Sequence, residues 1–166
     1  MPNKNTVIAV VLAVVVVILF IMLGFFGLKG VGAGPAPLTG PQALLEELAA
    51  NGGVSELRIY EIAPGTGEDA EAGDTIFVRY IGVLPDGTVF DSTDAHGGEP
   101  FSFTLGASNV IQGWHQGLMG VQKGERLLLA IPPELGYGAG GQGPIPPNST
   151  LIFDIEVVDI VPGIAQ

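Results

Sequence analysis

The sequence predicts an α+β domain in which an antiparallel sheet packs against one short helix, preceded by a transmembrane helix. Glycine and proline account for 26 and 13 of the 166 residues, a share that implies many turns and disfavours a long helical bundle. The hydrophobic content of 47% is nevertheless too high for a disordered chain. A chain of this length accommodates one domain and an appendage.

The N-terminus carries an uninterrupted apolar segment. Residues 7–28 hold no charged side chain, and as a helix they would span about 33 Å, enough to cross a bilayer. We therefore predict a tail at 1–6 and a transmembrane signal-anchor at 7–28. The alternative is signal cleavage at the small residues 31–34, which would release a secreted domain. Lys4 with the terminal amine outweighs Lys29 by about one charge, which favours a single-pass protein with an extracytoplasmic domain.

A linker with a short helix joins this segment to the domain. It spans residues 29–53 and begins with a Gly- and Pro-rich stretch that has no hydrophobic periodicity, so it should hold the domain away from the membrane. Within it, residues 42–50 place Leu44, Leu45 and Leu48 on one stripe, which predicts a short helix ended by the glycines that follow.

The domain itself covers residues 54–161 and is followed by a tail at 162–166. Segments 75–84 and 88–93 flank Pro85-Asp86-Gly87. Proline presets φ there and glycine takes a positive φ, so we predict a hairpin. β-branched, aromatic and alternating apolar residues predict the other strands, at 54–62, 101–106, 126–131 and 149–161.

One segment of the domain has helical spacing. Val110, Trp114 and Leu118 recur at i, i+4 and i+8 within residues 109–120, which places them on one face of a short helix that the sheet could cover. Strands with one packed helix make an α+β domain.

Charge and composition exclude several functional classes. Six basic residues stand against 17 acidic ones, so phosphate backbones should repel the domain and nucleic-acid binding is excluded. There is no cysteine, and the two histidines, His96 and His115, lack the spacing of a metal site. We therefore expect no metal and no cofactor. A GxGxxG string begins at Gly136, but prolines follow it where a dinucleotide site needs a helix.

Several aromatic side chains flank the predicted loops, and each taken alone could be a core residue. Their surroundings read VRYIGVLPDGTVFDST, PFSFTLG, NVIQGWHQGLMGVQKGERLLLAIPPELGYG and IPPNSTLIFDIEVV. In order and spacing these strings resemble the FKBP-type peptidyl-prolyl cis-trans isomerases over about residues 54–161. The most specific elements are FDS, VIQGW, and YG followed by IPPNSTLIFD.

The resemblance implies a half-barrel, an antiparallel sheet of five or six strands wrapped around the short helix, with an apolar pocket between them. It places Trp114 at the pocket floor and makes Asp91 the acid of the pocket, and it implies that the Ile111 N–H and the Tyr137 hydroxyl bind substrate carbonyls. The residues it implies for catalysis are Tyr80, Phe90, Asp91, Ile111, Trp114, Tyr137 and Phe153. Those it implies for substrate binding are Phe101, Val110 and Ile145.

The activity that the resemblance implies is rotation of Xaa-Pro peptide bonds in unfolded or folding client proteins. This rotation faces a barrier of roughly 18–20 kcal/mol because amide resonance is lost. No bond is broken, so no nucleophile is required, and an apolar pocket disfavours the charge-separated planar amide relative to the twisted one. The alternative is a non-catalytic module on the same fold that binds proline-containing segments or acts as a chaperone. Binding of macrolide inhibitors stays open.

The sequence departs from the family pattern in two loops. The segment 91–100 lacks the arginine that many members pair with the pocket acid, which leaves His96 as a candidate partner of Asp91. Gln142 stands near a position where members often carry a histidine.

Overall fold

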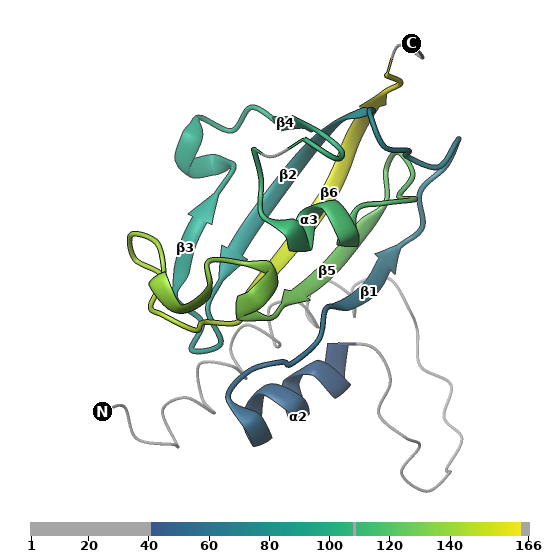
Figure 1. Cartoon of the computed structure of the whole chain (residues 1–166). Coiled ribbons are helices and arrows are strands. Elements are labelled where there is room, and N and C mark those ends of the chain that lie inside the picture. The colour runs from purple at the N-terminus through teal and green to yellow at the C-terminus, as the bar shows by residue number, and fades with distance from the viewer. Residues whose placement is uncertain (1–40, 108, 164–166) are drawn as a thin grey trace, which may run out of the picture.

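One antiparallel sheet organises the computed structural model, which describes residues 41–107 and 109–163. Within these residues six strands pair in the order β1-β5-β6-β2-β3, and β4 pairs with β2 as β3 does (Figure 1). The strands are β1 (Arg58–Ala63), β2 (Thr75–Val83), β3 (Val89–Ser92), β4 (Phe101–Thr104), β5 (Arg126–Ile131) and β6 (Leu151–Val161). The helical elements are α2 (Pro41–Asn51), α3 (Gln112–Gly117) and the 3₁₀ turns η1 (Asp94–His96), η2 (Pro133–Leu135) and η3 (Gly138–Gly140).

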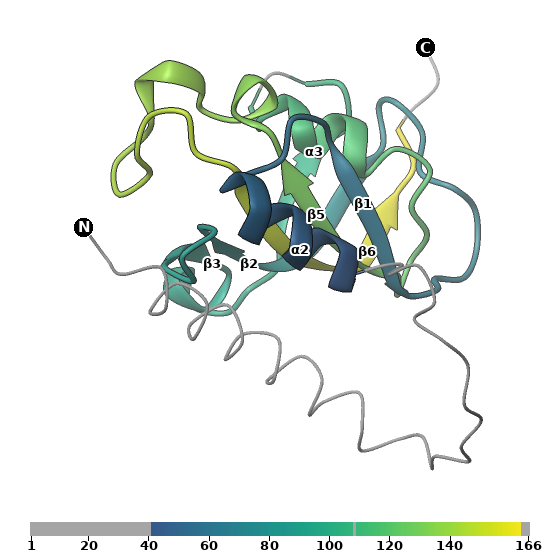
Figure 2. The same ribbon diagram turned by 90° about the horizontal axis from the view of Figure 1, so that it is seen from below.

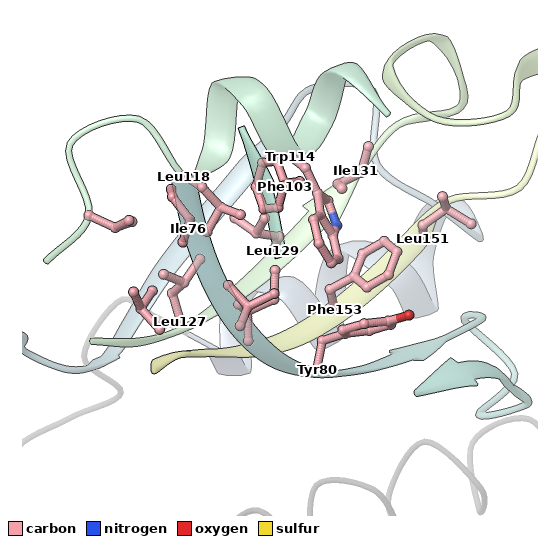
Figure 3. Close-up of a cluster of buried hydrophobic side chains, with 14 of the residues drawn as sticks. Ile76, Tyr80, Phe103, Trp114, Leu118, Leu127, Leu129, Ile131, Leu151 and Phe153 are labelled. Atoms are coloured by element: carbon pink, nitrogen blue, oxygen red, sulfur yellow. The ribbon is translucent and has the colours of Figure 1, made fainter. Parts of the chain in front are cut away.

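The short helix α3 lies against one face of the sheet, and two glycines bring it close. A Cβ on Gly113 would meet the Ile131 side chain, and one on Gly117 would come within 2.8 Å of Leu129. Because the two glycines are four residues apart, they lie on the same side of the helix, facing β5. The approach buries Trp114 in the main core, where it is 4% exposed (Figure 3).

The helix α2 covers the opposite face of the sheet, where it lies across β1, β5 and β6 (Figure 2). Leu44 and Leu48 of α2 form a second buried cluster with Leu128 and Ala130 of β5. Strand β5 is therefore covered on both faces, and each of its residues after Arg126 is buried. This explains why residues 126–131 read as a continuous apolar run instead of an alternation.

The predicted strands and helices are present. β5 has the predicted bounds, α2 exceeds the predicted helix at 42–50 by one residue at each end, and the other elements are shorter than predicted. The prediction of a strand from residue 54 was wrong by four residues. Val54 packs in the α2 cluster and its N–H donates to Thr150 Oγ1 at 3.0 Å, so β1 begins only at Arg58. The helix predicted at 109–120 is limited to α3, and the strand predicted from 149 begins at Leu151.

The predicted membrane segment at 7–28 and the tail at 1–6 lie outside the described residues. Among residues 41–107 and 109–163, no helix has the length and apolar character needed to cross a membrane.

Candidate active site

Aromatic rings from three strands gather beside Trp114 of α3, two of them in contact with it. The Trp114 ring lies 5.1 Å from that of Tyr80 on β2 and 5.3 Å from that of Phe153 on β6, and Figure 3 shows these three side chains facing one another. Phe90 of β3 lies 5.4 Å from Phe153. The interplanar angles are 82°, 81° and 88°, the edge-to-face arrangement that aromatic quadrupoles favour.

These rings border an open cavity of about 290 Å³. Its lining residues are Tyr80, Phe90, Asp91, His96, Phe101, Asn109, Val110, Ile111, Trp114, Tyr137 and Phe153. Nine of the ten site residues named from the sequence are therefore gathered around one cavity. The tenth, Ile145, does not line it and is buried in the main core at 6% exposure.

Asp91 is the acidic side chain of the cavity, and hydrogen bonds hold both of its carboxylate oxygens. The Tyr80 hydroxyl donates to Oδ2 at 2.7 Å, and the Ser92 N–H donates to Oδ1 at 2.9 Å. His96 Nε2 lies 2.7 Å from the same Oδ1. The candidate partner named from the sequence is therefore one of the three groups that contact the pocket acid.

Two tyrosine hydroxyls beside Asp91 stay protonated. Burial raises the pKa of Tyr80, and its hydrogen bond to Asp91 raises this pKa further. Burial and the Asp91 charge also raise the pKa of Tyr137. The Tyr80 hydroxyl is already engaged with Asp91, whereas that of Tyr137 is available in the cavity as a donor for a ligand carbonyl.

Two residues that the sequence reasoning missed shape the cavity: Gly82 on β2 and Thr93 directly after β3. A Cβ on Gly82 would lie 2.6 Å from Phe90 Cζ and 2.9 Å from Phe153 Cε1, so only glycine lets both rings rest on the strand. The buried Thr93 Oγ1 accepts the Tyr80 N–H at 2.8 Å and joins the end of β3 to β2. A glycine inside a predicted strand signals such close packing, but no sequence signal singled out Thr93.

The lining is mostly apolar and contains no reactive nucleophile. Among the described residues, no group of three or more His, Cys, Asp or Glu side chains could hold a metal ion. The Ile111 N–H, at the start of α3, finds no acceptor in the described part of the chain. The cavity therefore combines an aromatic floor with hydrogen-bond donors at its edge, which suits an apolar ring flanked by amide carbonyls.

Comparison with known proteins places this geometry in a known family. Residues 66–158 match the family model described as FKBP-type peptidyl-prolyl cis-trans isomerase. The chain is 52% identical over 112 residues to the peptidyl-prolyl cis-trans isomerase FKBP15-2 of Arabidopsis thaliana, an alignment that covers 66% of this chain and 68% of that relative. It is 47% identical over 105 residues to FkpA of Escherichia coli K12, covering 63% of this chain and 38% of FkpA.

Solved structures agree with the sequence matches. The crystal structure of FkpA from Escherichia coli superposes with a TM-score of 0.61 at 42% identity, over 73% of this chain and 57% of that one. The crystal structure of AtFKBP13 superposes with a TM-score of 0.57 at 38% identity, over 62% of this chain and 91% of that one. The match to FkpA thus covers less than two thirds of that protein.

Proposed function

This chain belongs to the family of FKBP-type peptidyl-prolyl cis-trans isomerases, and from that premise we propose that its aromatic cavity is the site where Xaa-Pro bonds are rotated. Relatives at about 50% identity are named as peptidyl-prolyl cis-trans isomerases, so isomerisation is the activity of the domain. The observation that carries the proposed site is the set of edge-to-face contacts that Trp114 makes with Tyr80 and Phe153 at the border of the 290 Å³ cavity.

In the proposed mechanism, the cavity favours the twisted amide. A pyrrolidine ring packs on Trp114 beside the Phe90–Phe153 pair, so water leaves the amide bond between proline and the residue before it. The planar amide has greater charge separation than the twisted one and loses more solvation in an apolar site, which lowers the barrier to rotation. The Ile111 N–H and the Tyr137 hydroxyl bind flanking carbonyls and hold the chain in orientation.

Asp91 has a separate role in this proposal. Its carboxylate accepts the Tyr80 hydroxyl and lies within 2.7 Å of His96 Nε2, so it faces the substrate from a fixed position. Phe101 and Val110 border the entrance and contact the residues that flank proline, while Ile145 supports the wall from the core.

The apolar segment 7–28 gives the domain its proposed location. We infer that it anchors the chain in a membrane with the domain on the extracytoplasmic side, where its clients are exported or surface proteins that are folding. The chain has no cysteine, so Ser55→Cys, at an exposed position, introduces a single thiol. Labelling by a membrane-impermeant reagent in intact cells is expected, and protection until lysis would refute this orientation. The mass of the labelled chain distinguishes an intact anchor from a cleaved signal.

The catalytic proposal is tested by NMR exchange spectroscopy on an Xaa-Pro peptide with the full chain in a mild detergent. The wild type should accelerate cis-trans exchange, and Phe90→Ala should reduce kcat/KM at least tenfold, which corresponds to about 1.4 kcal/mol of transition-state stabilisation. Val89→Ala is the matched control, because Val89 is the neighbouring residue, is 58% exposed and does not line the cavity.

Two results would contradict this proposal. A folded wild-type chain that binds the peptide without accelerating exchange would make the cavity a proline-binding or chaperone site. Equal losses in Phe90→Ala and Val89→Ala would place the chemistry outside the aromatic cavity. Competition by a macrolide inhibitor in the same assay decides whether that ligand class binds.

A further inference from the structure

The contact between His96 and Asp91 borders the cavity and joins a histidine to the acid of the cavity. His96 sits in η1, the turn that follows β3, and both side chains line the cavity. Their side chains are 66% and 38% exposed, so solvent reaches the pair when the cavity is empty. Histidine is the side-chain type whose charge most readily changes between about pH 5 and 8.

We propose that His96 is a pH-responsive positioning residue of this site. When protonated, it holds Asp91 in a neutralised ion pair and raises the affinity of the cavity for Xaa-Pro segments, and its deprotonation lowers that affinity. This inference rests on the proposed function, because it concerns how well the same cavity accepts its substrate.

The physical reason is linkage between protonation and substrate binding. A substrate that fills the cavity displaces water from Asp91 and His96, and lower local polarity strengthens the attraction between opposite charges. The bound state therefore favours protonated His96 more than the empty state does. Because coupling between two binding events is reciprocal, the proton must raise substrate affinity by the same factor.

Neutral His96 leaves an unbalanced charge in an apolar site. Nε2–H can still donate to Asp91 Oδ1, so the contact survives deprotonation. The carboxylate then keeps its full negative charge, and water must be removed from it before a proline ring can pack beside it, which is unfavourable. The effect should appear in KM more than in kcat.

The groups around His96 do not provide the same response. The titratable side chains nearby are Asp94 on η1, Asp91 on β3, Tyr80 on β2, Tyr137 after η2 and the exposed Glu99 ahead of β4. Ordinary carboxyl groups are ionised above about pH 5. The raised pKa values of Tyr80 and Tyr137 keep both hydroxyls neutral up to alkaline pH.

The test follows kcat/KM for an Xaa-Pro peptide from pH 5.5 to 8.5 with the full chain in mild detergent. In the wild type, we expect kcat/KM to fall about two- to fivefold as the pH rises, the range of a partly exposed ion pair. His96→Arg keeps a permanent cation and should give a flat profile at the acidic level. His96→Gln keeps a neutral donor and should give a flat profile at the alkaline level.

The second histidine provides the control. His115 is buried on α3, where its Nδ1 accepts the Gly106 N–H at 3.1 Å, and His115→Asn should retain the wild-type pH profile. If that variant does not fold, the two His96 variants decide alone, since both keep His115. A His96→Gln variant with the wild-type profile, or a flat profile in an active wild type, would overturn the proposal.

A readout without turnover separates this inference from the proposed function. The His96 ring signals are titrated by NMR with and without a saturating Xaa-Pro peptide. A two- to fivefold coupling corresponds to an upward shift of the midpoint by about 0.3–0.7 pH unit on binding. An unchanged midpoint would refute the coupling even if isomerisation is fast. A shifted midpoint in a chain that accelerates no exchange would retain the coupling and remove the enzymatic role.

Discussion

The substitution Gly82→Ala adds one methyl group beneath two rings of the proposed site. In the structure, the added Cβ would lie 2.6 Å from Phe90 Cζ, 2.7 Å from Phe90 Cε2 and 2.9 Å from Phe153 Cε1. Carbon atoms in favourable contact are about 3.5–4.0 Å apart. The Phe90 ring must therefore move by about 1 Å, or β3 must separate from β2.

Both responses reduce stability and activity together. Overpacking of this kind costs about 1–3 kcal/mol of unfolding free energy. A displaced Phe90 ring also changes the shape of the cavity. In a site that acts by orienting its substrate, a displacement of about 1 Å can lower the rate a hundredfold. We therefore expect a destabilised protein whose kcat/KM falls by more than tenfold.

Unfolding is followed through the fluorescence of Trp114, which is the single tryptophan of the chain, and activity is followed by NMR exchange. Gly140→Ala is the matched control, because no atom lies within 4 Å of the Cβ position there and the backbone is not in the left-handed region. It should stay within about 0.5 kcal/mol of the wild type. A Gly82→Ala protein with wild-type stability and kcat/KM would refute the claim that close packing on β2 shapes the cavity.

Two further substitutions test contacts outside the aromatic rings. Thr93→Val keeps the shape of the side chain but leaves the buried Tyr80 N–H without its acceptor. The unfolding free energy, measured in urea, should therefore drop by about 1–3 kcal/mol. A loss of unfolding free energy smaller than that of the exposed control Thr88→Val would contradict this. Hydrogen bonds from the Glu71 and Gly163 N–H groups lower the pKa of Asp74. Its contribution to stability is therefore present above the unfolded pKa of about 3.9 and lost as the pH falls through the lower folded value. The unfolding free energy of Asp74→Asn should decline less steeply between pH 5 and 2 than that of the wild type. If the two proteins lose stability with the same slope in acid, Asp74 does not contribute to acid unfolding.

Local sequence patterns predicted the strands well because each strand carries its own turn signals. The hairpin around Pro85-Asp86-Gly87 was fixed by turn chemistry, and β2 and β3 follow it to within a residue at each end. The start of β1 could not be predicted in this way. Val54 is apolar and continues the strand pattern, but it is buried by α2 and bound to Thr150, which is 96 residues distant in the chain. Contacts at that separation leave no local periodicity.

The same limit applies to α2. Its helical stripe was recognised, but a helix in a linker gave no reason to expect Leu44 and Leu48 to be buried on β5. The sequence signal for this packing is the continuous apolar run of β5, because such a run is typical of a strand that is buried on both faces. Two patterns have to be combined to predict this packing.

The residues of the candidate site could be predicted from the resemblance to a known family, but not from the chemistry of the side chains alone. No reactive group identifies it, and its aromatic residues are separately indistinguishable from core residues. Resemblance gathered nine of ten named residues around the cavity, but it gave no role to Gly82 or Thr93, which act through the position of other side chains.

In a site that acts by excluding water, the same side-chain contacts determine both the activity and the stability of the protein. The contacts of Trp114 with Tyr80 and Phe153 hold the core together and also form the proposed surface for proline, so most substitutions there must affect both. The pair of His96 and Asp91 is different. Its histidine is 66% exposed, and exposed ion pairs contribute little to folding, while both groups border the cavity. We therefore expect the rate at the proposed site to respond to solution conditions through this pair, while the fold stays the same.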